Sequence, residues 1–131
     1  MRRARGEWVL LTDADVVFTR GTLRQVVAWA EHEGKDFVTA LPDVRARGVV
    51  HQATVLALGE LMGVAARIWE IGREGSKAFA GVGPFNLMRR EVYDRSPGLG
   101  WLRMEVSEDI GVGLIMREAG ARPAILNARG A

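Results

Sequence analysis

An uncharged apolar run, Trp8 to Leu11, leads into two aspartates separated by one small residue, Asp13-Ala14-Asp15. A short run of this kind predicts a strand that is buried on both faces of a largely parallel sheet. The chain leaves such a sheet at the carboxyl end of the strand, where α/β proteins form their ligand crevices. In an extended segment, side chains two positions apart project to the same side. We therefore expect the two carboxylates to share one crevice.

The type of ligand follows from the chemistry of this acidic pair. Mg²⁺ and Mn²⁺ prefer hard oxygen ligands and are commonly shared between one or two carboxylates and substrate phosphates. Asp13 and Asp15 are accordingly candidate metal ligands. The alternative is that they only end the strand and begin a turn, because Asp is common in both roles.

The next segments complete a strand–helix–strand unit. Apolar positions at helical spacing predict a helix over Leu23–Glu33, with Thr22 as its cap and Gly34 as its stop. A second short strand is expected at Asp36–Ala40, adjacent and parallel to the first. The predicted fold class is α/β, with a mixed, mainly parallel sheet flanked by helices.

A second helix is expected from Ala53 onward. It carries an apolar stripe, which predicts packing against the core: Val55, Leu58, Leu61, Met62, Ala65, Ile68 and Trp69. A lipid-facing helix is the alternative, although Gly59 and Gly63 weaken it as an isolated amphipathic helix.

The segment Gly81-Val82-Gly83 reads as a loop that leads into a strand near Leu87. Glycines there allow the backbone to approach a ligand closely, and the alternative is a tight bend. The segment lacks the third glycine and the following helix of a dinucleotide-binding loop, which excludes that interpretation.

A second acidic pair, Glu108-Asp109, opens a helix predicted over Ile110–Ala119, with Ser107 as its cap. Carboxylates are favoured in the first turn of any helix by the helix dipole, so a structural role is the alternative to a chemical one.

Composition narrows the class of protein. With 131 residues, 48% of them hydrophobic, the chain has material for one globular core. The formal charge of +2 and the interspersed charges give no basic stripe for nucleic acid. There is no Cys, hence no disulfide and no thiolate metal site, which fits a reducing compartment. No uncharged apolar run reaches the length of about 18 residues that a membrane span needs.

Three motifs in this order resemble family 2 glycosyltransferases: the strand into Asp13-Ala14-Asp15, Gly81-Val82-Gly83 before Leu87-Met88-Arg89-Arg90, and Ser107-Glu108-Asp109 with Arg117 and Gly120 behind it. The spacing of roughly 90 residues between the acidic pairs also fits the family. The likeness is strongest to bacterial, membrane-associated members that glycosylate lipid or polyprenyl acceptors, and it implies the nucleotide-diphospho-sugar transferase fold.

The resemblance implies an inverting, metal-dependent transfer from a nucleotide-diphosphate sugar to an acceptor hydroxyl. Asp15 would bind Mg²⁺ or Mn²⁺, and Asp13 would contact the donor ribose or the metal. Gly81 and Gly83 would lie against the donor. Asp109 would be the general base, with Glu108 beside it shaping the acceptor site. The implied location is the cytoplasm, or the cytoplasmic face of a membrane reached through segments outside this chain.

The chain opens almost directly into the first predicted strand, and it ends before the family's Gln-x-x-Arg-Trp segment. We therefore expect residues 1–131 to form one partial, N-terminally truncated catalytic domain, which can carry the catalytic signature without being an active enzyme on its own. We also expect an unpaired strand edge and exposed apolar surface.

Two other classes of protein remain as alternatives. A haloacid-dehalogenase-like phosphatase also ends a strand in Asp-x-Asp, but it has Gly-Thr or a similar pair where this chain has Val16-Val17. A non-catalytic α/β binding module is the second alternative. Metal-dependent binding of nucleotide diphosphates would separate the transferase from such a module.

Overall fold

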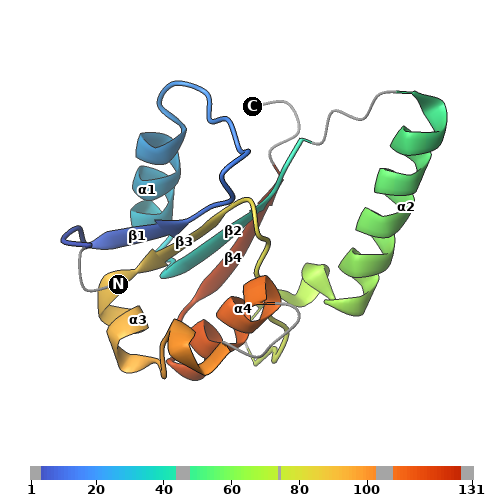
Figure 1. Cartoon of the computed structure of the whole chain (residues 1–131). Coiled ribbons are helices and arrows are strands. Elements are labelled where there is room, and N and C mark those ends of the chain that lie inside the picture. The colour runs from blue at the N-terminus through green and yellow to red at the C-terminus, as the bar shows by residue number, and fades with distance from the viewer. Residues whose placement is uncertain (1–3, 44–47, 74, 103–107, 128–131) are drawn as a thin grey trace.

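A computed structural model describes residues 4–43, 48–73, 75–102 and 108–127. They form a four-stranded sheet with helices on both of its faces (Figure 1). The strands are β1 (Trp8–Leu11), β2 (Phe37–Leu41), β3 (Asn86–Arg89) and β4 (Pro123–Asn127). The α-helices are α1 (Thr22–His32), α2 (Val49–Ala65), α3 (Arg90–Arg95) and α4 (Glu108–Glu118), with short 3₁₀ helices η1 (Ile68–Glu70) and η2 (Leu99–Leu102). The predicted mixed α/β class is confirmed.

The order of the strands differs from the prediction. The sheet runs β1-β3-β2-β4, so β3 lies antiparallel between β1 and β2. β1, β2 and β4 share one direction, but only β2 and β4 are parallel neighbours. The expected adjacency of β1 and β2 is therefore wrong. β1 is an edge strand with one buried residue, Val9, rather than a strand buried on both faces.

Each face of the sheet has its own apolar cluster, because side chains alternate along a strand. On one face, α1 packs through Ala30, Val26 and Val27 against Val38 and Leu87. The opposite face is covered by α3, η2 and α4; its buried cluster comprises Val9, Phe37, Met88, Val92, Leu102, Val112, Ile115, Met116 and Ala121. The two predicted helices that became α1 and α4 therefore do pack on the sheet.

The helix caps follow the prediction in part. Gly34 ends α1 in a left-handed conformation, with φ of 61°. Thr22 is instead the first residue of α1, after Gly21, and its hydroxyl donates to the carbonyl oxygen of Thr19. Thr22 is therefore not the cap that the sequence predicted. The expected cap of α4, Ser107, lies outside the described residues.

α2 departs most from the prediction. It stands away from the sheet (Figure 1), and only Gly63 on it is buried. Leu58, Leu61 and Met62 are exposed by 53%, 65% and 54%, so the predicted stripe does not pack against the core. Apolar side chains occupy the other sides of the helix as well, for example Leu56 and Val64. The pattern consequently indicated a helix without indicating which side would be covered. No helix among the described residues is long and apolar enough to cross a membrane.

Candidate functional site

The candidate site lies at the edge of the sheet where β1 and β2 end and β3 begins. Leu11 and Thr39 pair with Asn86 from either side, which brings these ends level with one another. The carboxyl ends of parallel strands are where α/β sheets place ligands. Thr12 joins β1 to the neighbouring loop, since its hydroxyl donates to the carbonyl oxygen of Pro84 over 2.8 Å.

The acidic motif that follows β1 forms a turn. The backbone nitrogen of Val16 donates to the carbonyl oxygen of Asp13 over 3.4 Å, and Ala14 and Asp15 occupy the middle of the turn. The expectation of an extended segment is therefore wrong, because Asp favours turns once a strand has ended. Both carboxylates are exposed at the sheet edge, as a substrate site requires. The relative orientation of the Asp13 and Asp15 carboxylates therefore depends on this turn and not on the alternation of side chains along a strand.

The glycine segment lies directly beside Asp13. Residues 82–85 form a tight turn in which the nitrogen of Phe85 donates to the carbonyl oxygen of Val82 over 3.0 Å. A Cβ atom on Gly83 would lie 2.9 Å from Oδ2 of Asp13, so the missing side chain leaves room for that carboxylate.

Asp109 reaches the same glycine segment from the first turn of α4. Its Oδ2 accepts a hydrogen bond from the backbone nitrogen of Gly83 over 3.3 Å. The backbone of Asp109 also packs tightly against Gly81. A Cβ atom on Gly81 would lie only 1.8 Å from the backbone oxygen of Asp109, so no larger residue fits there without a shift. Gly83 thus has Asp13 beside it and the carboxylate of Asp109 on its nitrogen, although these two acids are 96 positions apart in the chain. Glu108 is exposed at the start of α4.

Gly81 allows the glycine segment to pack closely against α4. Its open side is filled by the backbone of α4, and Gly113 on α4 makes a matching approach, where a Cβ would lie 2.5 Å from the carbonyl carbon of Ala80. Arg117 on α4 also contacts residues 77–79, which precede Gly81. Its guanidinium donates a hydrogen bond to the carbonyl oxygen of Lys77 and lies 4.9 Å from the centre of the Phe79 ring. The predicted donor contacts of Gly81 and Gly83 stay predictions.

A metal ion at Asp13 and Asp15 would need further coordinating atoms from a bound substrate or from water. Among the residues that the structure describes, no three His, Cys, Asp or Glu side chains are grouped closely enough to hold an ion. Two exposed carboxylates, Asp13 and Asp15, are nevertheless a suitable protein share of a Mg²⁺ or Mn²⁺ site, because substrate phosphates and water complete such sites.

Among the described residues, the most buried ion-paired carboxylate lies elsewhere, at Asp36. Asp36 precedes β2, and Arg122 precedes β4, so both stand at the amino ends of these strands, opposite the candidate site. Nε of Arg122 lies 2.8 Å from Oδ2 of Asp36, and Nε of Arg89 lies 3.5 Å from Oδ1. Burial by itself would raise the pKa of Asp36, but the hydrogen bonds and charge of Arg122, with the charge of Arg89, outweigh it and lower that pKa. This pair adds a side-chain link between the amino ends of β2 and β4, which already pair along their whole length.

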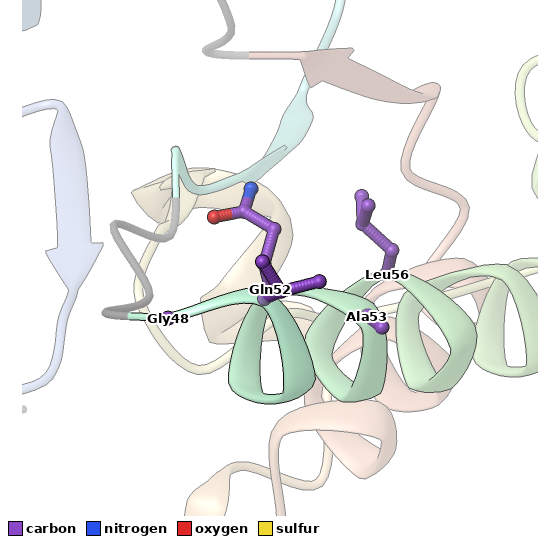
Figure 2. A pocket seen from close by; sticks show the side chains of 5 residues that line it. Gly48, Gln52, Ala53 and Leu56 are labelled. Atoms are coloured by element: carbon purple, nitrogen blue, oxygen red, sulfur yellow. The ribbon is translucent and has the colours of Figure 1, made fainter.

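A hollow beside the first turns of α2 is separate from the carboxylates. It is lined by Gly48, Val49, Gln52, Ala53 and Leu56, and Figure 2 shows Gln52 and Leu56 projecting from the helix there. None of these side chains is charged. This surface offers no group for acid–base or metal chemistry.

Sequence reasoning missed two polar residues at the site, Thr39 and Asn86. Both are buried, with exposures of 0% and 2%, and both contact the glycine segment. The available signal was a polar residue at an inward position of an otherwise apolar strand, in Phe37-Val38-Thr39 and in Asn86-Leu87-Met88.

Taken together, a mixed α/β sheet and acidic side chains at its carboxyl edge are those of a nucleotide-sugar transferase-like protein. Compared with known protein families, residues 1–129 match the family described as glycosyltransferase like family 2, and the chain belongs to that family. It is therefore a glycosyltransferase, and neither the phosphatase nor the non-catalytic module is supported. Comparisons with curated proteins and with solved structures gave no match.

Proposed function

We propose that this chain contributes the catalytic edge of an inverting glycosyltransferase, which moves a sugar from a nucleotide-diphosphate donor to an acceptor hydroxyl. The observation that carries the proposal is the convergence of Asp13 and Asp109 on Gly83, at the sheet edge where Asp15 also lies. A transfer of this type needs one carboxylate near the acceptor and others near the diphosphate, and the two acidic pairs supply both.

Asp109 is the proposed general base. It would take the proton of the acceptor hydroxyl as the acceptor oxygen bonds to the anomeric carbon of the sugar. The bond from that carbon to the diphosphate oxygen breaks in the same step, and the electron pair leaves with the nucleoside diphosphate. The half-buried position of Asp109 and its bond from the Gly83 nitrogen hold the carboxylate in a fixed orientation. Glu108, exposed next to it, would border the acceptor.

Asp15 and Asp13 are the proposed ligands of Mg²⁺ or Mn²⁺ and neighbours of the donor. A divalent ion bound there would offset the negative charge that develops on the departing diphosphate. Through such an ion, the two residues would hold the donor phosphates at the edge of the sheet, on the same side as the carboxylate on α4. Gly83 would keep the space beside Asp13 open.

The acceptor class and the location are proposed from the resemblance. They are a lipid or polyprenyl hydroxyl, and the cytoplasm or the cytoplasmic face of a membrane. We also propose that residues 1–131 are one part of a catalytic domain. Its activity is accordingly tested in the longest natural protein that contains this chain.

The test of the base compares Asp109→Asn with Glu118→Gln, an exposed acid at the other end of α4. Asp109→Asn should leave donor and metal binding almost intact, while transfer falls by about a hundredfold or more, as expected for the loss of a general base. Glu118→Gln should leave transfer unchanged. Near-normal turnover by Asp109→Asn would return this residue to a purely structural role.

The test of the metal site is titration calorimetry with Mn²⁺ and a nucleotide-diphosphate sugar. Asp15→Ala should abolish metal-dependent donor binding, whereas Asp94→Ala, an exposed acid on α3, should bind as the wild type does. Equal binding by the wild type and Asp15→Ala would exclude the proposed metal site.

A further inference from the structure

The apolar face of the sheet that α4 covers ends in two polar side chains. Thr39 lies two residues after Phe37 and Asn86 two before Met88, so alternation puts them on the same face as these core residues. They are paired across β2 and β3. Both are fully enclosed, at 0% and 2% exposure. Burying a polar side chain costs stability unless it is hydrogen-bonded, so their bonds indicate what these residues do.

Both side chains bond the backbone of the glycine segment. Oγ1 of Thr39 accepts from the nitrogen of Val82 over 3.0 Å and donates to the carbonyl oxygen of Phe85 over 3.0 Å. Asn86 bonds both backbone groups of Val82: Oδ1 accepts from its nitrogen over 3.1 Å, and Nδ2 donates to its carbonyl oxygen over 2.9 Å. The peptide groups of Val82 are thereby fixed in position and in rotation.

Val82 is the residue between the two glycines that meet the acids. The next nitrogen along the chain, that of Gly83, is the donor to Oδ2 of Asp109. The direction of that N–H is set by the peptide plane between Val82 and Gly83. Because Nδ2 of Asn86 bonds the carbonyl oxygen of this same peptide plane, it controls where the Gly83 N–H points.

We infer that Thr39 and Asn86 are positioning residues for transfer: through Val82 they orient the Gly83 N–H that holds the carboxylate of Asp109 beside Asp13. This inference rests on the proposed function, in which Asp109 is the base. Neither residue touches substrate. Their effect is on geometry, and a misplacement of about 1 Å at a reacting group can cost about a hundredfold in rate.

The decisive variants are Thr39→Val and Asn86→Ala. Thr39→Val keeps the shape of the side chain and removes both of its hydrogen bonds, whereas Thr39→Ser keeps the hydroxyl. The matched control is Val92→Ala, which truncates a buried residue of α3 in the apolar cluster on this face of the sheet and removes no hydrogen bond to the glycine segment. All four are compared with the wild type in the longest natural protein that contains the chain, for kcat, donor KM and melting temperature.

Thr39→Val and Asn86→Ala should each lower kcat at least tenfold, with a smaller change in donor KM, and Thr39→Ser should restore most of the rate. Val92→Ala should lower the melting temperature as much and leave kcat within twofold of the wild type, which a merely structural role of Thr39 and Asn86 would not allow.

Two results separate failure of the inference from failure of the proposed function. If Asp109→Asn is inactive while Thr39→Val and Asn86→Ala keep a normal kcat, the inference is wrong and the proposed base stands. If Asp109→Asn turns over normally, the proposed function fails first. A loss of kcat in Val92→Ala equal to that of Thr39→Val would also overturn the inference, because stability alone would then explain the rate.

Discussion

Replacing Gly81 by Ala tests the close approach of the glycine segment to α4. A Cβ at this position would lie 1.8 Å from the backbone oxygen of Asp109 and 2.8 Å from its carbonyl carbon. Ordinary contact begins at 3.4 Å, so the two backbones would have to separate by about 1.6 Å. Neither side of the contact is a flexible side chain that could turn away. The strain must therefore be taken up by the loop or by the start of α4.

Overpacking of a well-packed interior costs about 1–3 kcal/mol. Because both partners here are backbone, we expect the upper end, about 3 kcal/mol, which lowers the melting temperature of a chain of this size by about 10 °C. Sugar transfer should fall as well, because the displaced segment includes Gly83, whose backbone N–H donates a hydrogen bond to the carboxylate of Asp109.

The assay is thermal and denaturant unfolding followed by circular dichroism, with two matched glycine variants. Gly83→Ala would meet only the end of the exposed Asp13 side chain, at 2.9 Å, so it should cost less than about 1 kcal/mol. Gly59→Ala on α2 meets nothing within 4 Å and should stabilise the chain by about 0.5–1 kcal/mol. If Gly81→Ala proves as stable as Gly59→Ala, the described contact between the loop and α4 is incorrect.

Two further predictions concern the rest of the fold. Asp36→Asn should destabilise the chain by about 2 kcal/mol at pH 7, because it removes charge-assisted hydrogen bonds to Arg122. The folded-state pKa of Asp36 is lowered from its ordinary value of 3.8, so this stability is present above about pH 4 and is lost as the pH falls through the folded-state pKa. Unfolding curves of the wild type and Asp36→Asn should thus converge in acid, and a constant gap between them would contradict the argument. The exposed apolar side chains of α2 should drive self-association at micromolar concentrations, and Leu58→Lys with Leu61→Lys should reduce it without lowering the melting temperature. Sedimentation velocity measures the self-association of the wild type and of the double variant, and thermal unfolding measures their melting temperatures. A monomeric wild type would refute the prediction.

The sequence alone determined most of the helices and strands and the family of the protein. Apolar runs and helical spacing placed β1, β2, α1 and α4 to within about two residues, because burial periodicity and breakers such as Gly34 act over a few neighbouring positions. The three motifs also sufficed to indicate the family, since acidic pairs after a strand and at a helix start are local features.

The tertiary structure decided which elements meet. β3 comes between β1 and β2 although it follows β2 by more than 40 positions, and no local pattern specifies a partner at that distance. The apolar character of α2 likewise says nothing about what covers it. Thr39, Asn86 and Gly81 make their contacts only when the glycine segment is folded between the sheet edge and α4. Their significance depends on contacts with residues far along the chain, and such contacts exist only in the packed structure.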